Sequence, residues 1–236
     1  MDPYKLILEF FSNNKQDEFK KMSLFEAGFG DLGCLLDLYY ELPFHIYHGI
    51  EKYEESRLSV THDDELGSRS SGTYSSSDST YLRYPNYVES TKVKNTLHEN
   101  EFDSTFKLEF EKNIEHYFLN NSNCNHNYGI GIFSNLFHKF PDKQLPQNIV
   151  NWFYSNSSPD SYLLFTVMTS DLYALNGIDF IYKESDIKEL LKQFPGIIIS
   201  QSSFDSFDTY LVKKKHIIKQ TASPLKISDE VRLSHH

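Results

Sequence analysis

The 236-residue sequence predicts an α/β protein built on a doubly wound, mostly parallel sheet. Two observations carry this prediction. Residues 24–33 read as a short apolar strand, a turn with glycines at its first, third and sixth positions, and the start of an apolar helical pattern. Beyond them, β-type apolar runs alternate with amphipathic helical runs, which is typical of a parallel sheet covered by helices.

The glycine turn is expected to bind a nucleotide-like ligand. Gly28, Gly30 and Gly33 allow the backbone to turn tightly and to approach a ligand without an obstructing Cβ. The helix that begins beyond them directs free N–H groups at the turn. Glu26 lies two residues before the first glycine. Because a carboxylate there would repel a pyrophosphate, it favours a cationic ligand over a dinucleotide.

Composition narrows the function classes. The 33 acidic and 23 basic residues give a net charge of −10, which argues against nucleic acid and anionic lipid as partners. No apolar run approaches the roughly 20 residues of a membrane span, and residues 1–5 lack the apolar core of a signal peptide. Cys34 and Cys124 are too few for a disulfide scaffold or a Cys-based zinc site. We expect a cytoplasmic monomer or homodimer without a metal.

The chain is predicted to contain one main domain. Residues 1–22 read as an amphipathic helix that packs on the sheet, residues 23–215 as the cofactor-binding domain and residues 216–236 as a polar tail. A polar, Ser-rich insertion over residues 56–104 interrupts the domain. It is either a mobile lid over the substrate or an idle surface loop.

A second strand, residues 44–50, ends in Glu51, about 20 residues past the glycines. Doubly wound sheets place an acid at that point to accept hydrogen bonds from the ribose hydroxyls of an adenosine. The alternative is an ordinary surface acid at a strand end. The remaining strands are predicted over residues 106–110, 128–135, 161–169, 196–201 and 209–213, with a loop over 202–208.

Together, Glu26, the Gly-x-Gly turn and Glu51 resemble the class I S-adenosylmethionine-dependent methyltransferases. The resemblance runs from about residue 23 to residue 213 and is weak through residues 56–125. It implies a Rossmann-like sheet of seven strands, in which an antiparallel seventh strand lies between the fifth and the sixth. It also implies that Glu26 lies near the methionine portion of the cofactor, which carries the ammonium group.

The resemblance also implies a set of site residues. Asn135, an apolar pair, His138 and an aromatic residue match the family's segment beside the transferable methyl, with His138 as the acid–base candidate. Alternatively, Asn135 caps a helix and His138 lies on its exposed side. Asp171 and Tyr173 join His138 as candidates for substrate contact. The implied cofactor-binding residues are Glu26, Ala27, Gly28, Phe29, Gly30, Gly33, Glu51, Lys52, Asn113, Ser134 and Asn135.

The implied function is methyl transfer from S-adenosylmethionine to a small-molecule acceptor by in-line displacement. A sulfonium methyl is already activated, so the protein contributes mainly alignment and exclusion of water, and a base is needed only for a protonated acceptor. The sequence lacks the Asn-Pro-Pro-Tyr motif of amino methyltransferases that act on DNA bases or Gln. Two alternatives stay open: a non-methylating member of the same fold, of the aminopropyl type or purely cofactor-binding, and an NAD-binding oxidoreductase.

Overall fold

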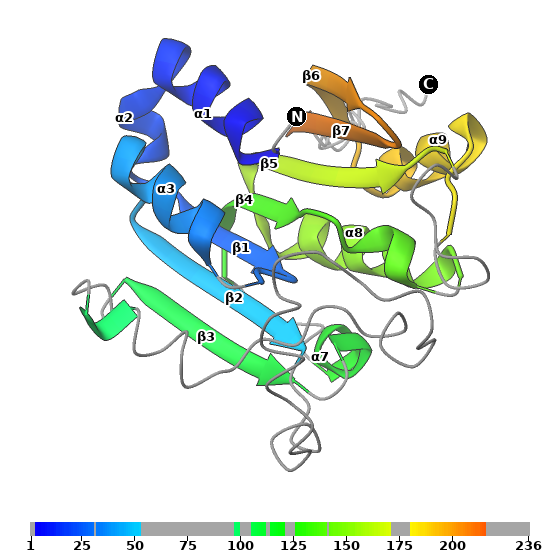
Figure 1. Ribbon diagram of the computed structural model, residues 1–236, viewed down its shortest axis with the longest axis horizontal. Coiled ribbons are helices and arrows are strands. Elements are labelled where there is room, and N and C mark those ends of the chain that lie inside the picture. Colours follow the sequence, from blue (N-terminus) through cyan, green and yellow to red (C-terminus); the bar gives the residue numbers. More distant parts are fainter. Residues whose placement is uncertain are drawn as a thin grey trace, which may run out of the picture.

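The computed structural model describes residues 3–30, 32–52, 97–99, 105–111, 114–120, 126–140, 142–170 and 180–215. Its strands are β1 (Ser23–Ala27), β2 (Ile46–Lys52), β3 (Phe106–Glu111), β4 (Tyr128–Phe133), β5 (Ser157–Met168), β6 (Gly196–Phe204) and β7 (Phe207–Lys214). They form one sheet in the order β3-β2-β1-β4-β5-β7-β6 (Figure 1). The first five strands are parallel, and β7 runs antiparallel to both β5 and β6. The predicted fold class and the antiparallel strand between the fifth and sixth are confirmed.

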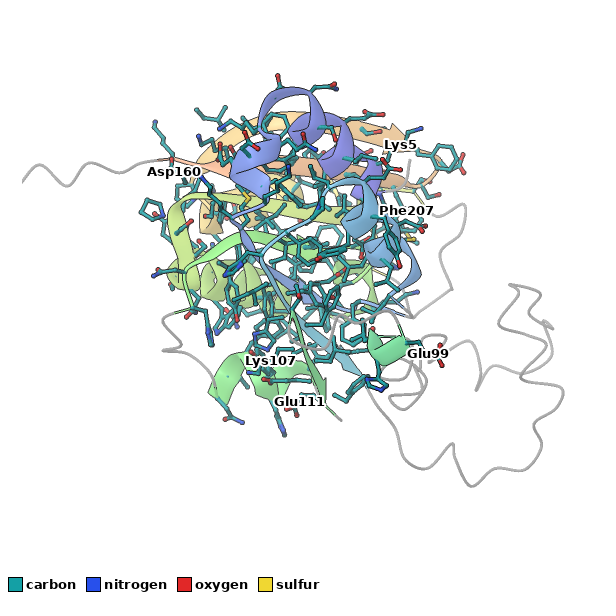
Figure 2. All side chains as sticks on the ribbon, turned by 90° about the vertical axis from the view of Figure 1, so that its left-hand side faces the viewer. Lys5, Glu99, Lys107, Glu111, Asp160 and Phe207 are labelled. Carbon is teal, nitrogen blue, oxygen red and sulfur yellow. The ribbon has the colours of Figure 1, made fainter. Side chains whose placement is uncertain are left out.

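Helices cover both faces of the sheet (Figure 1). They are α1 (Pro3–Asn14), α2 (Gln16–Phe19), α3 (Gly33–Glu41), α7 (Ile114–Asn120), α8 (Gln144–Asn156) and α9 (Glu184–Gln193), with a short 3-10 turn, η3 (Phe137–Lys139). Because side chains alternate along a strand, Leu24 packs under α1 to α3 and Phe25 under α7 to α9. Figure 2 shows side chains filling both layers, with Lys107 and Glu111 at the β3 edge.

The single helix predicted within residues 1–22 is wrong, because the helical segment divides at Lys15, whose φ of −152° is not helical. The two asparagines before the break explain its position. The side-chain amides of Asn13 and Asn14 donate to the carbonyls of Glu9 and Phe10, 2.8 and 2.9 Å away. Such local bonds compete with continuation of a helix.

Several strand boundaries also differ from the prediction. The loop expected over residues 202–208 is only a two-residue turn, in which Asp205 has a φ of 50°. The two strands extend into the expected loop because polar side chains do not prevent backbone pairing. Strand β4 ends two residues early, since Asn135 adopts a left-handed φ of 52°. Strand β5 begins at Ser157, directly where α8 ends.

Some predictions fall outside the described residues. Of the insertion 56–104, the structure describes only residues 97–99. Leu97 in this short segment is buried. The predicted tail, residues 216–236, lies wholly outside them, so the lid and tail remain predictions. Among the described helices, none combines the length and the apolar character that crossing a membrane requires.

Candidate functional site

The glycine turn lies at the carboxyl end of β1, between β1 and α3. Gly28 and Gly30 have φ angles of 79° and 63°, in the left-handed region that disfavours residues with a Cβ. The N–H of Gly28 donates to the carbonyl of Ile50 in β2, 2.8 Å away. Leu32 also has a positive φ, 68°, and precedes the first turn of α3, which begins at Gly33. The turn is therefore held against β2.

Glu51 meets this turn directly. Glu51 is 4% exposed, and its Oε2 accepts the N–H of Gly30 at 2.7 Å. A carboxylate at this point also interacts favourably with the positive N-terminal end of α3. The structure thus brings together the two predicted features, the glycines and the acid at the end of β2. Lys52 is the last residue of β2, and nothing is described of its side chain.

Glu26 is fully buried on the α1 side of β1. The hydroxyl of Tyr4 donates to its Oε1, and the hydroxyl of Tyr47 donates to its Oε2 at 2.8 Å. Burial raises the pKa of Glu26 to about 7, the two hydroxyls oppose this rise, and the nearby Glu51 adds to it. The carboxylate expected to face a cofactor ammonium therefore faces two tyrosines in this structure. Sequence reasoning missed both of them.

The segment after β4 closes the other side of the turn. An ideal Cβ built on Gly28 would lie 3.5 Å from Cδ1 of Leu136, so the segment touches the glycine turn. The N–H of Asn135 donates to Oγ1 of Thr166 at 2.5 Å, which fixes the end of β4 to β5. Ser134 is buried and Asn135 exposed. The alternative that Asn135 caps a helix is wrong, because η3 has Leu136 as its N-cap and no side-chain capping bond.

His138 lies in η3 and is only 3% exposed. Its ring packs edge-on against Phe207 at the start of β7, with centroids 5.3 Å apart, and its carbonyl accepts the N–H of Phe180 at 2.8 Å. The alternative that His138 sits on an exposed helix side is therefore wrong. Proton exchange with an acceptor would require that acceptor to sit directly against η3.

The other predicted site residues are distributed as follows. Ala27 is the buried last residue of β1, and Phe29 packs edge-on against Phe110 of β3. Asn113, Asp171 and Tyr173 lie outside the described residues and remain predictions. Within the described part of the chain, no group of three or more His, Cys, Asp or Glu side chains is arranged to hold a metal ion.

A second cluster of ionisable side chains lies on the opposite face of β2, around His48. Nδ1 of His48 is 2.5 Å from the hydroxyl of Tyr128, and Nε2 is 3.2 Å from Oε1 of Glu109. Tyr117 approaches Nε2 at 3.5 Å. Burial, with help from the charge of Lys107, lowers the pKa of His48 to about 4. The cluster is a buried hydrogen-bond network under α7, away from the glycine turn.

This network predicts acid sensitivity. The pKa of His48 is lower in the folded protein, so between about pH 6.5 and pH 4 the unfolded chain binds more protons and stability falls as pH falls. We expect His48→Gln to remove up to about 1.4 kcal/mol per pH unit from this slope. Urea unfolding at several pH values measures it. His45→Gln, at an exposed position, is the control, and equal slopes in the wild type and His48→Gln would contradict the assignment.

Comparisons with known proteins show the fold. No protein-family model and no curated protein matches the sequence. The 1,6-didemethyltoxoflavin-N1-methyltransferase of Burkholderia thailandensis, with S-adenosylhomocysteine bound, matches 92% of this chain and 78% of its own at 12% identity and a TM-score of 0.55. The magnesium protoporphyrin IX methyltransferase of Synechocystis PCC 6803, also with S-adenosylhomocysteine, matches 90% and 82% at 9% identity and 0.54.

Other matches are to larger proteins. The pyocyanin biosynthetic protein PhzM aligns over 88% of this chain at 8% identity and a TM-score of 0.53, but the chain spans only 54% of its length. The mitomycin 7-O-methyltransferase MmcR aligns over 90% at 10% identity and a TM-score of 0.55, with 53% of its length covered. At these identities the likeness establishes the architecture of the class I methyltransferase fold.

Proposed function

We propose that the protein binds S-adenosylmethionine and transfers its methyl group to a small-molecule acceptor. The observation that carries the proposal is the hydrogen bond between Gly30 and Glu51, which joins the glycine turn to a buried acid at the carboxyl edge of parallel strands. Ligands of open α/β sheets bind at that edge. The strand order, with antiparallel β7, supports a methyltransferase over a dinucleotide oxidoreductase.

The residues of the site then have distinct tasks. Glu51 accepts hydrogen bonds from the two ribose hydroxyls, and the N–H of Gly30 keeps its carboxylate in place. Gly30, where an ideal Cβ would meet no described atom within 4 Å, leaves room for the ligand to approach the backbone. When bound, S-adenosylmethionine supplies a methyl group on a positively charged sulfur. The protein's share of the reaction is to align an acceptor and exclude water.

The segment after β4 is the proposed acceptor side of the site. Ser134 and Asn135 follow the end of β4 beside the glycine turn, and the hydrogen bond to Thr166 fixes the backbone of Asn135. His138 follows in the same segment and is the proposed group that takes a proton from an acceptor which is protonated at neutral pH. Asp171 and Tyr173 complete the proposed acceptor site from the chain beyond β5.

Ligand binding tests the proposal. We expect S-adenosylmethionine and S-adenosylhomocysteine to bind in the micromolar range, about 8 kcal/mol, and to raise the melting temperature. Titration calorimetry with both ligands measures the affinity, and thermal unfolding measures the shift in melting temperature. NAD, the ligand of the alternative function, is tested in the same way. No heat from either at several hundred micromolar would remove the cofactor assignment. Binding of NAD instead would favour the oxidoreductase, and tight binding of decarboxylated S-adenosylmethionine the aminopropyl-type transferase.

A further inference from the structure

We propose that Tyr4, from the N-terminal helix α1, is a positioning residue of the cofactor site. Its hydroxyl, together with that of Tyr47, holds the Glu26 carboxylate in its ionised form behind the glycine turn. The cofactor part of this inference rests on the proposed function, whereas the control of Glu26 does not. It gives α1 a task beyond packing on the sheet.

The geometry leaves Glu26 dependent on these two hydroxyls. Its neighbours in the sheet are Gly49 of β2 and Ile132 of β4, neither of which carries a polar side chain. Among the residues that the structure describes, the ionisable groups that face it are Tyr4 from α1 and Tyr47 and Glu51 from β2. Glu51 is negative and disfavours a second charge nearby, so the tyrosine hydroxyls are the groups that favour ionisation.

The two tyrosines differ in how firmly they are held. Tyr47 lies within β2, is fully buried, and packs against Phe106 with centroids 5.0 Å apart. Tyr4 is half-buried in the first turn of α1, close to the N-terminus. The strength of the Tyr4 contact therefore depends on how α1 is seated on the sheet.

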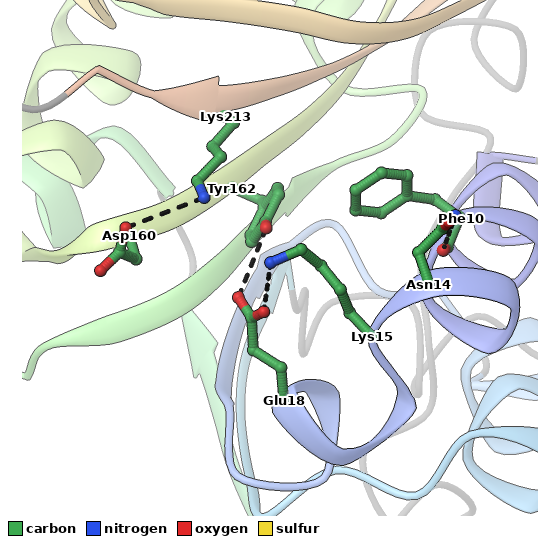
Figure 3. A network of polar contacts seen from close by, with 7 residues as sticks. All are labelled: Phe10, Asn14, Lys15, Glu18, Asp160, Tyr162 and Lys213. Atoms are coloured by element: carbon green, nitrogen blue, oxygen red, sulfur yellow. Dashed lines mark hydrogen bonds and ion pairs between the residues drawn. The ribbon is translucent and has the colours of Figure 1, made fainter.

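A separate set of contacts seats α1. Phe11 packs edge-on against Tyr162 of β5, with centroids 4.9 Å apart. Beyond the helix, Glu18 accepts hydrogen bonds from Lys15 and from the hydroxyl of Tyr162, the latter at 3.4 Å (Figure 3). The same figure shows Lys213 of β7 paired with Asp160. The carboxyl end of α1 and the adjoining α2 are thus fixed to β5 while the other end reaches Glu26.

The pKa of Glu26, about 7, lies close to neutral pH, so small changes around the carboxylate alter the fraction of Glu26 that is ionised when a ligand binds. A cationic group at the glycine turn is attracted only by the charged carboxylate. Loss of the Tyr4 hydroxyl removes one of the two tyrosine donors described at the carboxylate, which raises the pKa of Glu26 further. The effect on a cationic ligand should then be largest near neutral pH and vanish once Glu26 is ionised in every variant.

The ligand-free test is a carboxyl-carbon NMR titration of the full chain labelled at Glu. We expect one Glu signal with a midpoint near pH 7, absent in Glu26→Gln. In Tyr4→Phe and in Tyr47→Phe this midpoint should rise by roughly one pH unit. Tyr40→Phe, on an exposed tyrosine, is the matched control and should leave it unchanged. A midpoint that does not move in either folded variant would overturn the proposal.

Calorimetry with S-adenosylhomocysteine at pH 7 and pH 8.5 is the second arm. Tyr4→Phe should weaken binding about fivefold at pH 7, the loss expected when the carboxylate is less ionised, and by less than about twofold at pH 8.5. An equal loss at both pH values would indicate lost packing and overturn the cofactor role. If the NMR midpoint shifts but no variant binds the ligand, the control of Glu26 stands and the proposed function fails.

Discussion

Replacing Glu51 with Ala is expected to weaken S-adenosylhomocysteine binding by about 10- to 100-fold, or roughly 1.4–2.7 kcal/mol. Two losses combine in this variant. Two ribose hydroxyls would lose a charged acceptor, and such charge-assisted bonds are worth more than neutral ones. The N–H of Gly30, now 2.7 Å from the carboxylate, would lose its partner as well, so the glycine turn would be less well ordered before the ligand arrives.

Calorimetry at pH 7.5 measures the effect, and two variants interpret it. Glu51→Gln keeps an acceptor for Gly30 but removes the charge, so it should fall between the wild type and Glu51→Ala. Glu41→Ala changes an exposed acid at the end of α3 and should leave the affinity within twofold. A folded Glu51→Ala protein with the parental dissociation constant would show that Glu51 is an ordinary strand-end acid.

The elements that could be predicted from sequence are those whose signal is local. The glycine spacing and the continuous apolar run of β4 each lie within a few residues, and both occur in the elements predicted from them. The place of the antiparallel strand was implied by the family resemblance, and it is observed. The predicted strand ends are wrong where backbone hydrogen bonds continue a strand through residues that lack an alternation of apolar and polar side chains. Residues 202–204 and 207–208 are polar apart from Phe204 and Phe207, yet they continue the edge hairpin by backbone hydrogen bonds.

In the candidate site, too, the residues with a local sequence signal were predicted and those placed by contacts between distant segments were not. Glu51 and Gly30 were predicted to belong together from their spacing, and a hydrogen bond joins them. Tyr4 and Tyr47 could not be linked to Glu26 from sequence, because the contact depends on how α1 is seated across β1 and β2. A tyrosine in an amphipathic helix or a buried strand reads as core. Likewise, the burial of His138 depends partly on Phe207, which arrives from the last strand.

Gly49→Ala adds one methyl group to β2, and we expect it to lower the stability of the folded protein more than the same change at Gly30. An ideal Cβ there would lie 2.6 Å from Cδ1 of Phe29 and 2.6 Å from Cε1 of Tyr47, distances that real Cβ atoms do not show. Both rings are buried, and Tyr47 is further held by its bond to Glu26. Because neither ring can move away cheaply, overpacking should cost about 2–3 kcal/mol of unfolding free energy in Gly49→Ala.

Gly30→Ala separates this clash from backbone strain. In the described part of the chain, no atom beyond the two adjoining residues lies within 4 Å of an ideal Cβ on Gly30. Its φ of 63° disfavours alanine, so we expect a loss of only about 1 kcal/mol. Urea unfolding of both variants at pH 7.5 measures the two costs. Gly49→Ala should also weaken the binding of S-adenosylhomocysteine. Displacing Phe29 disturbs the glycine turn, and displacing Tyr47 disturbs a hydrogen-bond donor to Glu26. If Gly49→Ala proved no less stable than Gly30→Ala, the close packing of Gly49 against these two rings would be refuted.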